Sequence, residues 1–395
     1  MQIEEPRKNN VNAWAPFGLG FRPFFLLAGI SAVVLMWIWL GELSAPAEFK
    51  AYYSGSYWHA HEMLFGYTVA VVSGFLLTAV RNWTDLPMPS GRPLLGLVLL
   101  WLIARLLPYV SGVIPAWLIA VVDLSLLPLV AWSMALRIVK RRQYRNLIFV
   151  VVVFFMFIAN LLVHLEVMGF SQNTAGKGLY LMMFLVMLII TVMGGRVIPF
   201  FAERGVQGIT TKSWQLIEIM SVVSVLLLLT AVLFFNDTLA MSAALLAFVV
   251  HLIRLAGWYD NKIWQEPLVW ILLVAYAWIV LGFGLIALAY MGKMPLLPAW
   301  HAYTVGGLGG LTLGMMARVA LGHTGRAMKL PKWMASAFVL INVAAVFRVI
   351  LPLLLPQHYQ ELVNIAGVLW IVAFLIFVVI YTPILLKARV DGRPG

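Results

Sequence analysis

Twelve long apolar segments dominate this chain, and they restrict its fold more than any other feature does. Each segment is long enough to cross about 30 Å of hydrocarbon as a helix. In lipid, a spanning segment has to satisfy its own backbone hydrogen bonds, and a separate apolar run can do so only as a helix. The segments cover residues 17–40, 58–80, 94–110, 115–137, 147–168, 179–200, 214–235, 238–256, 268–290, 299–320, 333–355 and 361–386.

The composition excludes a large soluble protein. Of the side chains, 63% are hydrophobic and only 11% are charged, whereas a soluble domain is about half apolar and about a quarter charged. The excess apolar surface has to face lipid. We therefore predict an all-α polytopic membrane protein, with a tail over residues 1–16, a single twelve-helix domain over residues 17–386 and a second tail over residues 387–395.

The basic residues predict the orientation of this domain. A net charge of +12 would point to nucleic acid on a soluble protein, but here the Lys and Arg residues lie in short loops, the pattern that fixes membrane orientation. If both termini are cytoplasmic, only three of the 27 fall in outer loops: Lys50, Lys177 and Lys293. Four more fall within spans, and the rest, including Arg7 and Lys8, lie inside. This bias favours cytoplasmic termini and no nucleic-acid partner.

The sequence contains no cysteine. This composition excludes disulfides, thiolate nucleophiles, iron–sulfur clusters and covalently attached c-type haem. Any metal or haem has to be held by His, Met, Tyr or a carboxylate. The sequence also has no Walker-type phosphate-binding loop and no His-Glu-x-x-His zinc motif. ATP-driven transport within this chain is therefore not expected.

A weak internal period runs through the sequence. His59, Tyr180 and His301 begin segments two, six and ten, and they are spaced 121 residues apart. Each of these segments ends near an arginine: Arg81, Arg196 and Arg318. The period would suit three four-helix repeats. The alternative is that helices of similar length give similar spacings.

Ionisable side chains inside a membrane are energetically expensive, so they mark functional positions. In the predicted orientation, most of the histidines map to the outer half: His59, His61, His164, His301 and His358. The inner half holds His251 and His323. The outer group favours a metal or haem site, because neutral imidazole is the commonest side-chain metal ligand and no cysteine is available. The alternative is that these histidines are interfacial and form hydrogen bonds to loops.

The sharpest local signal is the sequence Trp58-His59-Ala60-His61-Glu62. On a regular helix His59 and His61 are about 200° apart, so they cannot both face one site. His59 shares its face with Met63, whose thioether would suit Cu(I). Either the segment is not yet helical at this point, or the two histidines have different roles.

His301 precedes Gly306, Gly310 and Gly314 at four-residue spacing. Small residues at this spacing allow helices to approach closely. Close packing would hold His301 in a fixed position, and we expect it to face His59 or His61 across the bundle.

Arg105 and Arg348 lie within spans and each requires an anionic partner. Asp123 or Glu62 would form a structural ion pair. Haem propionates would serve equally well, because a guanidinium binds a carboxylate in a bidentate way.

Several strings resemble the hallmarks of the NnrS family, and the resemblance spans residue 17 to the last helices. The strings are Phe21 to Phe25, Trp58 to Tyr67, Gly194 to Phe201 and Met316 to Arg326. The resemblance implies a bacterial inner-membrane protein with twelve helices that carries haem and copper. It also implies a role in the response to nitric oxide and in relief of nitrosative stress, often alongside denitrification. By motif, the metal-site pattern carries over to four residues: His59, His61, His301 and His323.

We therefore predict two overlapping sets of site residues, and the catalytic residues stay unknown. The candidate cofactor-binding residues are His59, His61, His301, His164, Arg105 and Arg348. The candidate metal ligands are His59, His61, His301, His323, His251 and Met63. Beside a nitric-oxide-binding haem–copper protein, two other functions stay open. One is a transporter or channel for a small anion or nitrogen oxide. The other is a nitric oxide oxidoreductase that requires an external electron-donor protein.

Overall fold

The computed structural model describes residues 13–44 and 52–393, and within them it is helical. The predicted basic residues Arg7, Lys8 and Lys50 lie outside the described residues, as do residues 1–12 of the N-terminal tail. Twelve helical spans in the described part are long and apolar enough to cross a membrane. The predicted all-α, twelve-helix fold is therefore confirmed.

Nine of the twelve spans contain a single long α-helix. These helices are α1 (Phe21–Ser44), α4 (Arg92–Leu106), α5 (Ala116–Lys140), α6 (Leu147–Val167), α7 (Ala175–Gly205), α8 (Gln215–Phe234), α9 (Asp237–Trp258), α10 (Pro267–Tyr290) and α15 (Tyr359–Leu386). Short 3-10 turns extend some of them: η2 (Leu107–Val110), η3 (Tyr144–Asn146), η4 (Asn261–Gln265) and η7 (Pro356–His358).

The other three spans are each interrupted by a π-helical segment. Span two runs through α2 (Gly55–His61), η1 (Glu62–Thr68) and α3 (Val69–Thr84). Span ten runs through α11 (Leu296–His301), η5 (Ala302–Gly309) and α12 (Gly310–His323). Span eleven runs through α13 (Met334–Ala345), η6 (Val346–Ile350) and α14 (Leu351–Leu354). Such segments are rare and frequently occur at functional sites.

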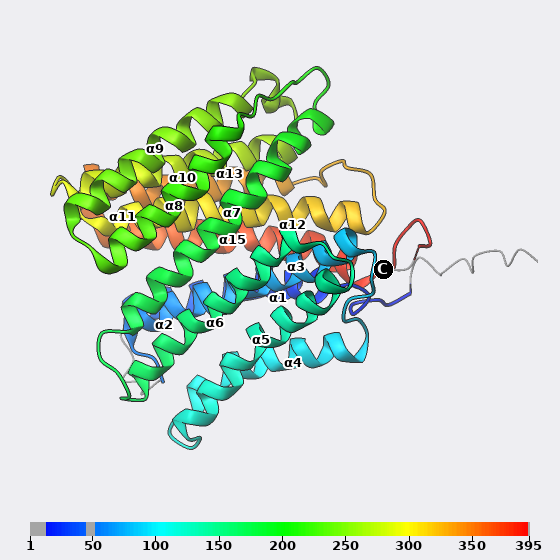
Figure 1. Cartoon of the computed structure of the whole chain (residues 1–395), viewed down its shortest axis with the longest axis horizontal. Helices are drawn as coiled ribbons and strands as arrows, with labels where there is room; N and C mark the ends of the chain where they lie inside the picture. Colours follow the sequence, from blue (N-terminus) through cyan, green and yellow to red (C-terminus); the bar gives the residue numbers. More distant parts are fainter. Residues whose placement is uncertain (1–12, 45–51, 394–395) are drawn as a thin grey trace, which may run out of the picture.

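The spans form one bundle (Figure 1), and they differ in how much of each is buried inside it. Spans two and ten are the most buried, followed by α10 and α7. The first helix, α1, packs along the last, α15. Spans two, six and ten, which carry the 121-residue period, are therefore all among the buried spans, although the repeat itself stays a prediction.

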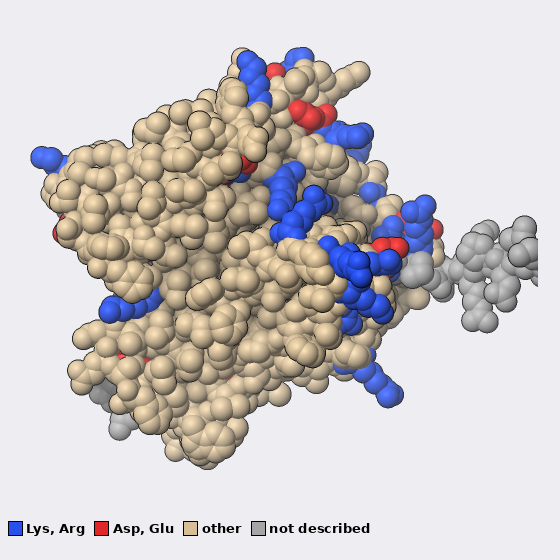
Figure 2. All heavy atoms as spheres, in the orientation of Figure 1, with Lys and Arg blue, Asp and Glu red and all other residues tan. Residues whose placement is uncertain are grey.

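Both ends of the described chain meet at one end of the bundle. The Ala15 amide donates to the Leu386 carbonyl at 2.8 Å, and the Ala388 amide donates to the Ala13 carbonyl at 2.8 Å. The buried Arg22 guanidinium donates to the Leu385 carbonyl at 3.0 Å and so fixes α1 against the end of α15. An even number of spans requires this arrangement. Figure 2 shows Lys and Arg gathered at the end of the bundle where the C-terminus lies.

The side of the membrane on which this end lies stays a prediction that single cysteines can test, because the chain has no native cysteine. Lys293→Cys lies in a predicted outer loop and Lys140→Cys at a predicted inner one, and both positions are exposed. In intact cells an impermeant maleimide is expected to label Lys293→Cys only. Lys140→Cys should react after permeabilisation. The reverse pattern would place both termini outside.

Close helix packing gives a second prediction. A Cβ atom at Gly178 on α7 would lie 2.4 Å from the Ala159 backbone oxygen on α6. Gly178→Ala should therefore destabilise the protein by about 1–3 kcal/mol, the usual cost of overpacking, and lower the thermal midpoint in detergent. The control is Gly96→Ala on α4, which meets nothing within 4 Å. An unchanged midpoint for Gly178→Ala would contradict the described α6–α7 contact.

Candidate functional site

A cavity of about 540 Å³ lies between spans one, two, six, ten, eleven and twelve. Its volume falls within the range of about 300–1,000 Å³ that is typical of ligand pockets. The residues that line it include Trp39, His59, Met63, Tyr180, His301 and Arg348. The lining therefore contains all three positions of the sequence period, and it brings together two histidines that are far apart in the sequence.

His301 is oriented as metal-ligating histidines are. Its Nδ1 atom lies 2.9 Å from the Leu297 carbonyl oxygen, which can only accept a hydrogen bond. Nδ1 therefore carries the proton, and in the neutral ring Nε2 keeps a free electron pair. A backbone carbonyl that fixes the tautomer in this way is a common partner of a metal ligand.

His59 contributes a second imidazole to the same cavity. Its ring stacks on Trp39, with 4.4 Å between the ring centroids. Its Nδ1 atom is buried and has no hydrogen-bond partner among the described residues. Buried polar atoms normally have a partner, so an unpartnered nitrogen in a cavity wall indicates a position where a ligand completes the structure.

Arg348, from the π-helical segment η6, brings a positive charge to the cavity wall. Its guanidinium lies 5.7 Å from the centre of the Tyr359 ring. The buried Nη1 atom of Arg348 has no hydrogen-bond partner among the described residues. An unpaired buried cation is costly, so a ligand with an anionic group would be stabilised beside it.

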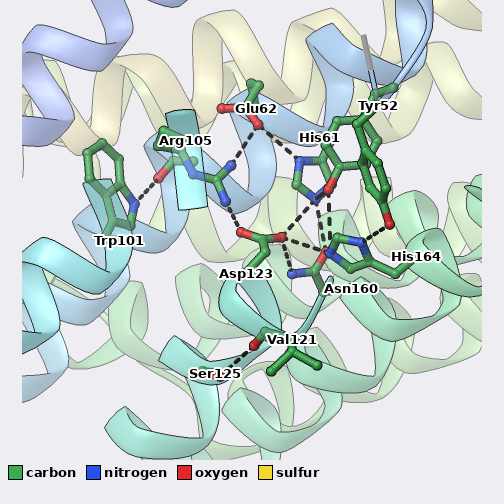
Figure 3. Close-up of polar contacts among 12 residues, drawn as sticks. Tyr52, His61, Glu62, Trp101, Arg105, Val121, Asp123, Ser125, Asn160 and His164 are labelled. Carbon is green, nitrogen blue, oxygen red and sulfur yellow. Dashed lines mark hydrogen bonds and ion pairs between the residues drawn. The ribbon is translucent and has the colours of Figure 1, made fainter. Parts of the chain in front are cut away.

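A second group of polar residues, drawn in Figure 3, includes two residues of span two that do not line the cavity. We call it the polar cluster, and it consists of His61, Glu62, Arg105, Asp123, Asn160 and His164. These side chains come from α2, η1, α4, α5 and α6. His59 and His61 thus face different sites, as their angular separation on a helix predicts.

Arg105 forms the ion pairs of the polar cluster. Its Nη1 atom donates to Glu62 Oε1 at 2.7 Å, and its Nη2 atom pairs with Asp123 Oδ1. The sequence allowed Arg105 to pair with protein carboxylates or with haem propionates, and in the structure it pairs with the carboxylates. Arg105 and the likewise predicted His61 and His164 do not line the cavity, so the structure divides the predicted cofactor-binding set between two sites.

The imidazoles of the polar cluster converge on Asp123 Oδ2. His164 Nε2 lies 3.0 Å from this oxygen and His61 Nε2 lies 3.3 Å from it. Asn160 Nδ2 donates to the same oxygen at 2.8 Å. One ligand atom from each of His61, Asp123 and His164 lies within 4.8 Å of the others, a spacing at which the three residues could hold a metal ion.

Two tyrosines just before α2 complete the polar cluster. The Tyr52 hydroxyl lies 3.0 Å from His164 Nδ1, and the Tyr53 hydroxyl lies 3.0 Å from His61 Nε2. Burial raises the pKa of both phenols above the usual value, so both hydroxyls keep their protons near neutral pH. Sequence reasoning missed Tyr52, Tyr53 and Asn160. Asn160 was detectable, because it stands four residues before His164 and so on the same helix face.

The two remaining predicted histidines lie in neither site. His251 uses both ring nitrogens, with the Tyr276 hydroxyl 2.5 Å from Nδ1 and the Ser221 carbonyl 3.2 Å from Nε2. His323 lies at the end of α12, where its ring is 5.6 Å from that of Phe21. The structure therefore separates both from the histidines of the cavity and of the polar cluster.

The ion pairs of the polar cluster give a stability prediction. Arg105→Met would leave Glu62 and Asp123 without their cation inside the membrane, and breaking a buried pair costs about 3–5 kcal/mol. The thermal midpoint in detergent should fall sharply, and adding Glu62→Gln should recover part of the loss. Arg92→Met, at the exposed start of α4, is the control. If Arg105→Met is as stable as the wild type, the ion pairs do not stabilise the fold.

Comparison with known proteins gives one match that covers nearly the whole chain. A family model described as NnrS protein matches residues 15–389. A search of curated proteins found none that matches this chain.

Proposed function

The chain belongs to the NnrS family, and from that premise we propose that it is a bacterial inner-membrane protein that carries haem and copper, binds nitric oxide and relieves nitrosative stress. Membership of the family supports a membrane protein of the nitric oxide response. The observation that supports haem and copper binding is the cavity, which is lined by His59, His301 and Arg348.

The residues of the cavity fit haem. His301 presents an unprotonated Nε2 atom, and His59 has a buried Nδ1 atom without a partner among the described residues. These two histidines would hold the haem iron. Arg348, whose buried Nη1 atom is also unpartnered there, would bind a propionate. When bound, haem would supply an iron atom with affinity for nitric oxide.

The other lining residues support the same proposal. Trp39, Tyr67 and Trp300 place aromatic surface around the two histidines, and such surface excludes water and packs against a flat ring. Met63 lines the cavity as well. A thioether is a ligand that Cu(I) prefers, so we place copper beside Met63. Nitric oxide is a small uncharged molecule, and the surrounding lipid would deliver it to an apolar cavity.

A transporter or channel for a small anion is the second candidate, and Arg348 is the observation that favours it. An unpaired guanidinium in a cavity wall would attract an anion as well as a propionate. Anion flux in proteoliposomes that is lost in Arg348→Ala, from protein without haem, would favour transport. A nitric oxide oxidoreductase is the third candidate. It would need an external electron-donor protein, and turnover by purified, reduced protein decides it.

The test of the haem proposal is the absorption spectrum and the iron content of purified protein. The wild type is expected to show a Soret band and bound iron. His301→Ala and His59→Ala should each shift or abolish the band. Arg348→Ala should weaken haem binding by about 10- to 100-fold, the effect of one charged hydrogen bond.

The control variant is His358→Ala, an exposed histidine in η7 at the start of span twelve, whose Nδ1 atom lies 2.7 Å from Glu361 Oε2. Its spectrum and iron content should equal those of the wild type. Copper content is measured in the same samples, and Met63→Leu is expected to lower it. A wild type without a Soret band, or His59→Ala and His301→Ala spectra that match it, would contradict the proposal.

A further inference from the structure

The polar cluster has a charge that its own residues do not balance. Its ion pairs join two carboxylates, Glu62 and Asp123, to one guanidinium, that of Arg105. All three side chains are less than one tenth exposed. Burying a charge costs several kcal/mol unless it is compensated. With neutral imidazoles, the polar cluster therefore has room for one further cation.

The hydrogen bonds indicate that this cation would lie at the Nε2 atoms of His61 and His164. His61 Nδ1 lies 3.2 Å from Glu62 Oε1, and a carboxylate can only accept, so Nδ1 carries the proton. In the neutral ring, the Nε2 electron pair then faces Asp123 Oδ2 at 3.3 Å and Asn160 Oδ1 at 2.9 Å. The Tyr53 hydroxyl, 3.0 Å away, can donate to this pair, but the two oxygens repel it, and a cation among the three atoms would remove that repulsion. That cation is either a second proton on His61 or a metal ion.

The geometry also fits a metal ion. In a tetrahedral site with bonds of 2.0–2.1 Å, neighbouring ligand atoms are about 3.4 Å apart. Asp123 Oδ2 is 3.0 Å from His164 Nε2 and 3.3 Å from His61 Nε2, close to that spacing. The Tyr53 hydroxyl borders the same point, at 3.0 Å from His61 Nε2 and 3.4 Å from His164 Nε2.

The surroundings of these atoms are also those of a metal site. A carboxylate on the far nitrogen of His61, and a hydroxyl on the far nitrogen of His164, orient both rings as outer partners of metal ligands do. Arg105 holds the other oxygen of Asp123.

We propose that the polar cluster is a metal centre separate from the cavity, in which His61 Nε2, His164 Nε2 and Asp123 Oδ2 bind one divalent transition-metal ion. The donor set has two imidazoles and a carboxylate and contains no sulfur. Nitrogen and oxygen ligands of this kind suit borderline divalent ions such as Zn²⁺ and Fe²⁺, whereas Cu(I) prefers soft sulfur. The inference is independent of the proposed haem and copper sites, because it shares no ligand with them.

The experiment uses purified full-length protein from which bound metal has been removed with a chelator, and Zn²⁺ alone is the probe. The wild type is expected to bind one Zn²⁺ per chain, measured by elemental analysis and calorimetry. Asp123→Asn and His164→Ala should each weaken that binding by at least about 100-fold, because they remove a direct ligand rather than an outer partner. Co²⁺ in place of Zn²⁺ should give the absorption bands of a tetrahedral ion.

The controls separate this centre from the cavity. His59→Ala and Met63→Leu change residues of the cavity and should leave Zn²⁺ binding at the wild-type level, whatever happens to haem and copper. Asp123→Asn should keep the spectrum of any bound haem, which also shows that the variant is folded. The proposal is overturned if the wild type binds no Zn²⁺ and gives no tetrahedral Co²⁺ spectrum. It is overturned equally if Asp123→Asn and His164→Ala bind Zn²⁺ as tightly as the wild type.

Discussion

The cost of placing charge in hydrocarbon is the constraint on which the rest of this structure depends. Because of this cost, every ionisable side chain in a span has to pair with another residue, reach the membrane surface or bind a ligand. Two arginines show the contrast. Arg105 is compensated by Glu62 and Asp123, whereas Arg348 lies in a cavity wall with a buried nitrogen that no described residue satisfies. The first arginine holds helices together, and the second is positioned for an anionic ligand.

The hydrogen-bond partners of the ring nitrogens also distinguish the histidines. His251 forms two hydrogen bonds through its ring, and the neighbouring Arg254 pairs with Glu218. That group is complete without any ligand, so it stabilises the contacts among α8, α9 and α10. His301 has one nitrogen fixed by the Leu297 carbonyl, which leaves the other for a ligand. Burial alone does not distinguish these cases. The hydrogen bonds of both ring nitrogens do.

Much of the fold could be predicted from the sequence, because a lipid environment constrains properties of short sequence segments. The length of each apolar segment and the position of the basic residues can be read directly from short stretches of the sequence, and they predict the twelve spans. Membrane depth also grouped His59 with His301, which line one cavity. The lateral position of a side chain depends on helix rotation and packing, and the sequence indicates it only within one helix, as for His59 and His61. Depth alone therefore grouped Arg105, His61 and His164 with the cavity residues, although they face the other side of span two. The neutral partners Tyr53 and Asn160 carry no charge signal at all.

Span two connects the two sites physically. His59 faces the cavity and His61 faces the polar cluster, and a single residue separates them. The π-helical segment η1 begins directly after His61, and it carries Glu62 toward the polar cluster and Met63 toward the cavity. A rotation of this turn that draws one histidine toward a ligand moves the other away from its own partners. Asp123 and Asn160 on neighbouring spans resist that rotation by their contacts with His61. Because Asn160 and Tyr53 also contact His61, this restraint does not depend on Asp123 alone.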